Sequence, residues 1–244
     1  MKNFYSVIIG TELLNGRRTD SHFDFLNKEL IKRGWEQKAS FVIKDEIPLI
    51  EDIFSFIKKD KNSVMFSFGG IGATPDDYTR ECAAKIFTNG KMEVNELAKK
   101  CILSQFGDGA YPHRIHMASL PINASLLHNV ITNVPGFYLD NRFFFTPGFP
   151  SMSQNMIIEA LDKLYPHNKV KHRYTLKAFC SENILIDTMK QIPSNIELSS
   201  LPTINKNNRT TVISLTSYDK RYVLKYFELF IDFLKKEKIK YKKL

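Results

Sequence analysis

A glycine-rich segment followed by two acids is the part of the chain best suited to chemistry. It has the sequence GGIGATPDD and covers residues 69–77. Glycine allows backbone N–H groups to approach a phosphate closely, and the N-terminal end of a following helix attracts the same anion. Thr74 before Pro75 is a typical helix start. Three glycines between an apolar run and a helix start therefore predict a phosphate-binding loop that includes Gly69, Gly70, Gly72 and Thr74.

Asp76 and Asp77 add negative charge to this predicted phosphate site. Either carboxylate alone would be favourable in the first turn of a helix, by about 0.3–1 kcal/mol. Two of them repel a phosphate, by about 4 kcal/mol per pair of unit charges at about 4 Å and an effective dielectric of about 20. A divalent cation removes this conflict, because hard cations bind carboxylate and phosphate oxygens together. We therefore predict a metal–phosphate site with Mg²⁺ or Co²⁺ held by Asp76 and Asp77.

The elements that must position these residues follow from alternating apolar runs and helical patterns. Strands are expected at residues 7–9, 41–43, 64–68, 130–134 and 142–146, and helices from about residue 21 and over 47–57, 74–87, 93–106 and 151–164. This alternation predicts an α/β, three-layer fold with a mostly parallel sheet and helices on both faces.

Ligands of such sheets bind beyond the carboxyl ends of the strands. Several further residues are expected at that edge with the glycine-rich loop. Asp45 follows the second strand and would add a carboxylate to the metal–phosphate site. Glu12 follows the first strand, where a role in the site and a hydrogen bond to a loop are equally consistent with its position. The other residues expected to contact the ligand are Gly10, Gly148 and Ser151.

The last third of the chain differs from the rest in charge. Residues 1–165 contain 19 basic and 19 acidic side chains, whereas residues 166–244 contain 16 basic and 7 acidic ones and so carry the whole net charge of +9. We predict one domain over residues 1–166 and a small basic α+β domain over 167–244, with strands near 173–179 and 211–215 and helices over 181–191 and from 219. A lysine-rich surface explains the charge most simply, and nucleic-acid binding is the alternative.

Composition excludes several classes of protein. No apolar run approaches the roughly 20 residues that span a bilayer, so no membrane partner is expected. Three cysteines without a CxxC pair argue against a disulfide framework and a thiolate zinc site. The apolar stretch near the N-terminus is too short for a signal peptide. A cytoplasmic protein is therefore expected.

Five motifs, in order, carry a resemblance to a known family. They are IIGTELLNG at 8–16, GGIGATPDDYT at 69–79, an Arg-x-x-x-Ala-x-x-Pro pattern at 114–121, NVPGF at 133–137 and TPGFP at 146–150. Residues 7–164 resemble the molybdenum-cofactor biosynthesis domain of MogA, MoaB and gephyrin-type proteins, and more closely its CinA-like (competence/damage-inducible) branch. Residues from about 170 to 244 are similar to the small KH-like domain of that branch.

This resemblance implies a three-layer α/β fold, a dimer or trimer, and a nucleotide or pterin phosphate as ligand. It implies chemical roles for Asp45 and Asp77, and metal-dependent hydrolysis of ADP-ribose-type pyrophosphates. The chain ends before the deamidase domain of full-length CinA proteins, so we do not expect that activity. Ala73 replaces the usual proline, and Asp20-Ser21-His22 replaces Asn-Thr-Asn. The tail lacks the GxxG loop that clamps nucleic acid, which argues against a nucleic-acid partner.

Three functional hypotheses follow. In the first, the chain is a metal-dependent hydrolase of nucleotide diphosphate-sugars: the loop and the Thr74 helix start hold the diphosphate, a cation on Asp76 and Asp77 activates a water, and Asp45 orients or deprotonates that water. In the second, the same pocket binds molybdopterin or supports an adenylyltransferase reaction. In the third, the chain is a non-catalytic nucleic-acid-binding protein.

Overall fold

The computed structural model describes residues 2–205 and 208–244. The chain divides into two compact units after Asn168, and each is described by itself. The first unit contains a six-stranded sheet in the order β2-β1-β3-β8-β7-β6. Its strands are β1 (Asn3–Ile9), β2 (Gln37–Ile43), β3 (Ser63–Phe68), β6 (Ser125–Leu127), β7 (Gly136–Leu139) and β8 (Phe143–Thr146).

The four strands β2, β1, β3 and β8 are parallel, and β7 and β6 continue the sheet in antiparallel pairing. All six residues of β3 are buried, because the strand is covered on both faces. Its side chains alternate between two cores: Phe66 and Phe68 belong to one and Met65 to the other. The predicted α/β fold with a mostly parallel sheet is therefore confirmed.

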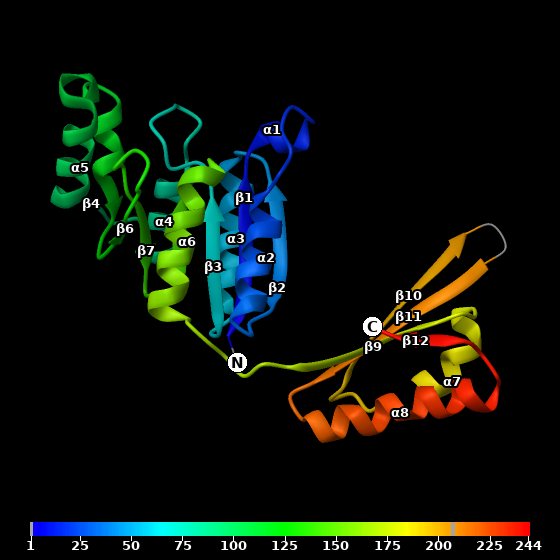
Figure 1. The fold of residues 1–244 in the computed structure, drawn as a ribbon. Coiled ribbons are helices and arrows are strands. Elements are labelled where there is room, and N and C mark those ends of the chain that lie inside the picture. Colours follow the sequence, from blue (N-terminus) through cyan, green and yellow to red (C-terminus); the bar gives the residue numbers. More distant parts are fainter. Residues whose placement is uncertain (1, 206–207) are drawn as a thin grey trace. The chain divides into compact units, whose positions relative to one another are not determined.

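Helices form the two outer layers (Figure 1). The apolar sides of α2 (His22–Lys32) and α6 (Pro150–Leu164) pack into the core that contains Phe66. Those of α3 (Ile47–Lys59), α4 (Thr79–Phe87) and α5 (Glu96–Phe106) pack into the core that contains Met65. The remaining elements of the unit are α1 (Thr11–Leu14), the strand pair β4 (Met92–Val94) and β5 (Ser119–Pro121), and the 3₁₀ turns η1 (Gly107–Ala110) and η2 (Arg114–Ala118).

Two of the predicted elements in this unit are wrong. The helix expected to start at Thr74 begins at Thr79. No strand forms over residues 130–134, where the buried side chain of Asn129 organises a loop instead. Its Oδ1 accepts hydrogen bonds from the amides of Ile131 (3.0 Å) and Thr132 (3.3 Å), and its Nδ2 donates to Thr132 Oγ1 (2.8 Å) and to the Val134 carbonyl (2.9 Å).

The second unit is a four-stranded antiparallel sheet with one long helix against it. The strand order is β10-β11-β9-β12, with β9 (His172–Ala178), β10 (Glu197–Asn205), β11 (Asn208–Ser217) and β12 (Tyr241–Lys243). Helix α8 (Lys220–Lys236) begins after Asp219, whose Oδ1 accepts the Tyr222 amide at 2.9 Å. Its buried side chains join those of β9 and β11 in a separate core. Strands β10 and β12 were not predicted, and residues 181–191 form η3 (Glu182–Leu185) and a short α7 (Ile186–Met189) rather than one helix.

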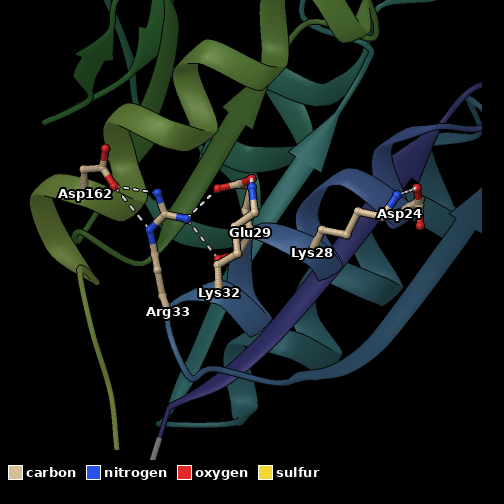
Figure 2. A network of polar contacts seen from close by, with 6 residues as sticks. All are labelled: Asp24, Lys28, Glu29, Lys32, Arg33 and Asp162. Atoms are coloured by element: carbon tan, nitrogen blue, oxygen red, sulfur yellow. Dashed lines mark hydrogen bonds and ion pairs between the residues drawn. The ribbon is translucent and has the colours of Figure 1, made fainter. Parts of the chain in front are cut away.

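Arg33 joins two helices of the first unit through a network of ion pairs (Figure 2). Its side chain is only 11% exposed. Its Nη1 donates to Glu29 Oε2 at 2.6 Å on α2, and its Nη2 donates to Asp162 Oδ1 at 2.5 Å on α6. Lys28 and Asp24, also in Figure 2, form an exposed pair on α2 alone. The ion pairs of Arg33 therefore hold α2 and α6 together, whereas the Lys28–Asp24 pair lies within α2.

We expect Arg33→Met to lower the free energy of unfolding by about 2 kcal/mol or more, because it leaves the buried Glu29 carboxylate paired only with the exposed Lys32. Lys28→Met is the matched control and should cost less than about 1 kcal/mol. Urea denaturation of both variants measures the difference. Equal losses in the two variants would contradict a role for Arg33 in joining α2 to α6.

The same network predicts a pH dependence. Burial alone would raise the pKa of Glu29, but hydrogen bonds from Lys32 and Arg33 outweigh it and hold the pKa below its ordinary value. A carboxylate with a lowered folded-state pKa contributes stability above its unfolded pKa of about 4.3 and loses it as the pH falls further. The gap in stability between wild type and Arg33→Met should therefore be full at neutral pH and shrink below about pH 4.

Candidate functional site

The carboxyl ends of the parallel strands bring the predicted loop residues to one edge of the sheet. A Cβ on Gly69, which follows β3, would lie 2.4 Å from the carbonyl oxygen of Ile9 at the end of β1. A Cβ on Gly148, after β8, would lie 3.4 Å from the Cα of Gly69. The Gly10 amide donates to the Ile43 carbonyl at the end of β2 (3.0 Å). Gly10, Gly69 and Gly148 therefore lie where four strands end, at the end of the sheet that carries α1 and the start of α6 (Figure 1).

The glycine-rich segment forms a closed loop rather than the first turn of a helix. The Thr79 amide donates to the Gly70 carbonyl at 2.9 Å, and the Thr79 hydroxyl donates to the Gly69 carbonyl at 3.0 Å. Buried Arg80 donates through Nη1 to the carbonyls of Ile71 and Gly72, the latter at 2.5 Å. These hydrogen bonds occupy the backbone carbonyls of the loop and do not involve its backbone amides.

Those donors are the backbone amides of residues 70–73. In the hydrogen bonds of residues 2–205 and 208–244, none of these four amides donates to a protein acceptor. Runs of backbone N–H groups without a protein partner are the donors that phosphate-binding loops use. The loop therefore retains the donors of an anion site, although the predicted helix dipole at Thr74 does not contribute to it.

The carboxylates of Asp45 and Asp77 are each held by the amide and hydroxyl of one threonine. Asp77 Oδ2 accepts the amide of Thr74 at 2.8 Å and its hydroxyl at 2.5 Å. Asp45 Oδ2 accepts the amide of Thr11 at 2.7 Å and its hydroxyl at 2.9 Å. Both carboxylates are partly exposed, and in the described part of the chain neither Oδ1 atom accepts a hydrogen bond. Each side chain is thus fixed through one oxygen while the other is available to a cation or a water.

Asp76 is exposed. The nearby Thr74 side chain and the backbone amide of Asp76 itself lower the pKa of its carboxyl, so it is ionised at neutral pH. Within the residues that the structure describes, no lysine or arginine nitrogen lies within 4.0 Å of a carboxylate oxygen of Asp76 or Asp77.

The same described residues contain no group of three or more histidine, cysteine, aspartate or glutamate side chains placed to hold a metal. A protein cage is therefore not present in that part of the chain. Asp76 and Asp77 fit the other common arrangement, in which one or two carboxylates, waters and substrate phosphates together hold Mg²⁺.

The other predicted ligand residues lie along the same edge. The Glu12 carboxylate lies over Gly10, where an added Cβ would be 3.0 Å from Oε2, and Glu12 Oε1 is 3.7 Å from Arg18 Nη1. Ser151 is exposed in the first turn of α6. The start of α6 lacks a side-chain cap, so its positive end is open to an anion.

His22 is a residue at this edge to which the sequence analysis gave no role. It is 5% exposed and stacks on Phe68 with 4.5 Å between ring centroids. Its Nε2 lies 3.3 Å from the Gly148 carbonyl, and its Nδ1 lies 3.4 Å from Ser153 Oγ. Burial lowers the pKa of His22, so the ring is neutral at neutral pH. The only sequence signal at His22 was that Asp20-Ser21-His22 replaces the Asn-Thr-Asn of the CinA-like branch.

A small pocket opens beside His22. Its lining combines the end of β1 with the loop before α2 and the start of α6, and includes Glu12, Arg18, Asp20, His22, Gly148 and Pro150.

The sequence analysis also gave no role to Arg80, since nothing in the sequence indicates that this arginine is buried beneath the glycine-rich loop.

Residues 6–167 match the family model described as a probable molybdopterin binding domain. The chain belongs to this family. All the predicted site residues lie inside the matched range, and the second unit lies almost wholly outside it.

The relatives of this chain include members of the CinA-like branch. A CinA-like protein of Fusobacterium nucleatum is 30% identical over 191 residues, which cover 76% of this chain and 47% of that protein. A protein of Sulfolobus acidocaldarius is 26% identical over 197 residues, covering 78% and 74% of the two chains. The crystal structure of CinA from Thermoplasma acidophilum, described as of unknown function, is 26% identical with a TM-score of 0.59 and covers 66% of this chain and 98% of its own.

This chain therefore spans about half the length of the Fusobacterium relative. The resemblance to the CinA-like branch that the motifs indicated is confirmed. In the described residues, no helix has the length and apolar character that crossing a membrane requires.

Proposed function

We propose that the first unit binds a nucleotide diphosphate-sugar such as ADP-ribose and hydrolyses its pyrophosphate linkage with the help of Mg²⁺ or Co²⁺. The observation that carries this proposal is the matched pair of Asp45 and Asp77. Each is fixed through Oδ2 by a threonine amide and hydroxyl, and each keeps Oδ1 for the reaction. A purely structural carboxylate does not require an open oxygen.

Two features support binding of the diphosphate. The amides of residues 70–73 donate to no protein acceptor in the described chain, and α6 points its uncapped N-terminal end toward the same edge. Together they supply several N–H donors and a positive partial charge. Gly70, Gly72 and Gly148 allow this close packing of the loop, because a Cβ on each would meet Thr79, Asp77 or Gly69 respectively.

Asp45 and Asp77 then take different roles in hydrolysis. Asp77, with Asp76, would hold the cation, which when bound lowers the pKa of a coordinated water and polarises the phosphate. Asp45 would accept the proton of the attacking water through Oδ1. The new P–O bond forms as the bond from phosphorus to the bridging oxygen breaks, so that ADP-ribose yields AMP and ribose 5-phosphate.

The test is an assay of the purified chain with ADP-ribose and either Mg²⁺ or Co²⁺. We expect AMP to appear with the metal and to disappear when EDTA is added. Chromatography of the nucleotides measures both products of the cleavage. Absence of AMP with every divalent metal tried would overturn the proposal.

Molybdopterin binding is the second candidate, and the match to the molybdopterin-binding domain family favours it. The same amides would hold the phosphate of the pterin. Calorimetry with molybdopterin and with ADP-ribose separates the candidates, because the correct ligand binds more tightly.

We also propose that the chain forms a dimer or trimer, which light scattering after gel filtration measures. We propose that it has no nucleic-acid partner.

A further inference from the structure

An exposed aromatic ring lies at the start of α6, next to the candidate site. Phe149 is 57% exposed and separates Gly148 from the first residue of the helix. The guanidinium of Arg18 lies over this ring, with its Cζ 5.5 Å from the ring centroid. Arg18 also pairs with Glu12 across 3.7 Å. Packing into a core does not explain this ring, because more than half of its surface is open.

The backbone on both sides of Phe149 is fixed. The Gly148 carbonyl lies 3.3 Å from His22 Nε2. The Phe149 carbonyl accepts the amides of Met152 and Ser153, both at 3.0 Å. The ring is therefore presented from an ordered position, so stacking on it costs little ordering of the chain.

The position of the ring relates it to the phosphate-binding loop. Gly148 contacts Gly69, the first residue of the glycine-rich loop, and Phe149 is the next residue in the chain. The pocket beside His22 lies between Arg18 and Gly148. The ring and the glycine-rich loop therefore follow the adjacent parallel strands β8 and β3, with Gly148 against Gly69.

We propose that Phe149 and Arg18 form the subsite for the aromatic base of a nucleotide ligand. Bases stack on aromatic rings and on arginine guanidinium planes, and these are the two planes that the site offers. The inference rests on the proposed function for the position of the phosphates, and it adds which end of the substrate the site recognises. Because stacking is tolerant of base identity, the subsite favours nucleotides over sugar phosphates without selecting one base.

Calorimetry with AMP and with ribose 5-phosphate tests the subsite without any turnover. Wild type should bind AMP about 5- to 150-fold more tightly than ribose 5-phosphate, which is the range for one stacked base. Phe149→Ala should remove most of that difference by weakening AMP binding, and Phe149→Tyr should restore it. Phe56→Ala is the matched control, because this ring is 55% exposed on α3, and it should leave AMP binding as in wild type.

A fluorescent variant detects stacking directly. In Phe149→Trp, AMP should quench the new indole, and ribose 5-phosphate should not. The one natural tryptophan, Trp35, packs against Phe4 and Tyr165, so wild type supplies the background signal. A structural role for Phe149 would not produce base-dependent quenching.

The possible results separate this inference from the proposed function. If Phe149→Ala binds AMP as tightly as wild type does, or if wild type does not prefer AMP, the subsite is refuted. ADP-ribose hydrolysis by the same preparation then shows whether the proposed function still holds. Hydrolysis with unaltered AMP binding in Phe149→Ala would leave the reaction in place and overturn only the subsite.

Discussion

Asp77→Asn is expected to lower the rate of ADP-ribose hydrolysis by at least about a hundredfold. The reason is that an amide nitrogen would replace the open oxygen that the cation requires, and metal activation contributes several kcal/mol to such reactions. The remaining amide oxygen can still accept the bonds from the Thr74 amide and hydroxyl. The loop should therefore keep its conformation while the chemistry is lost.

The measurement is kcat as a function of Mg²⁺ concentration, with the melting temperature as a check on folding. Asp52→Asn is the matched control, since Asp52 is an exposed carboxylate on α3. We expect it to retain wild-type kcat. Full activity in Asp77→Asn would show that this carboxylate does not hold the cation.

Gly69→Ala is expected to destabilise the first unit by about 2–5 kcal/mol. Gly69 has a φ of +96°, a conformation that costs an L-residue about 1–2 kcal/mol. In addition, the new Cβ would lie 2.4 Å from the Ile9 carbonyl oxygen. That contact is with backbone of the central sheet, which can move only by disturbing the strand, and forced contacts of this kind cost about 1–3 kcal/mol.

Gly16→Ala separates the two contributions. Gly16 has a φ of +79°, and a Cβ there would meet nothing within 4 Å. It should therefore show the backbone cost alone, about 1–2 kcal/mol. Urea denaturation of both variants measures the difference. If the two variants lose equal stability, the close approach of β3 to β1 is not a constraint on Gly69.

The parallel sheet could be predicted because its strands are apolar on both sides. Val64, Met65 and Phe66 alternate between two cores and leave no polar face, so their run is continuous in the sequence. The glycines after β3 and β8 could be predicted as well, because the carboxyl ends of parallel strands share one edge.

The helix start at Thr74 was wrong for a local reason. Thr74 and Pro75 have the residue types of a helix start, and Asp77 accepts the Thr74 amide as an acid in a first helical turn would. The chain does not continue as a helix there, because the amide and hydroxyl of Thr79 close the loop onto Gly70 and Gly69. Helix propensity could not reveal this loop closure.

Other features depend on contacts between distant parts of the chain. Residues 130–134 are apolar enough for a strand, but the side chain of Asn129 bonds the backbone into a loop. His22 reaches its site through Gly148, which is 126 residues away. Strand β10 lies at the edge of its sheet and contains Pro202. A proline is atypical of a strand, so the residues of β10 did not predict one.

Helix α6 links the site to a firmly braced region. Its 15 residues make a rod about 22 Å long, with Phe149 and Ser151 at one end. At the other end, Asp162 is clamped by Arg33, and Tyr165 Oη donates to the Asn141 carbonyl at 2.5 Å. Because a helix is rigid along its axis, a displacement of the Asp162 end would also displace Phe149 and Ser151 at the opposite end.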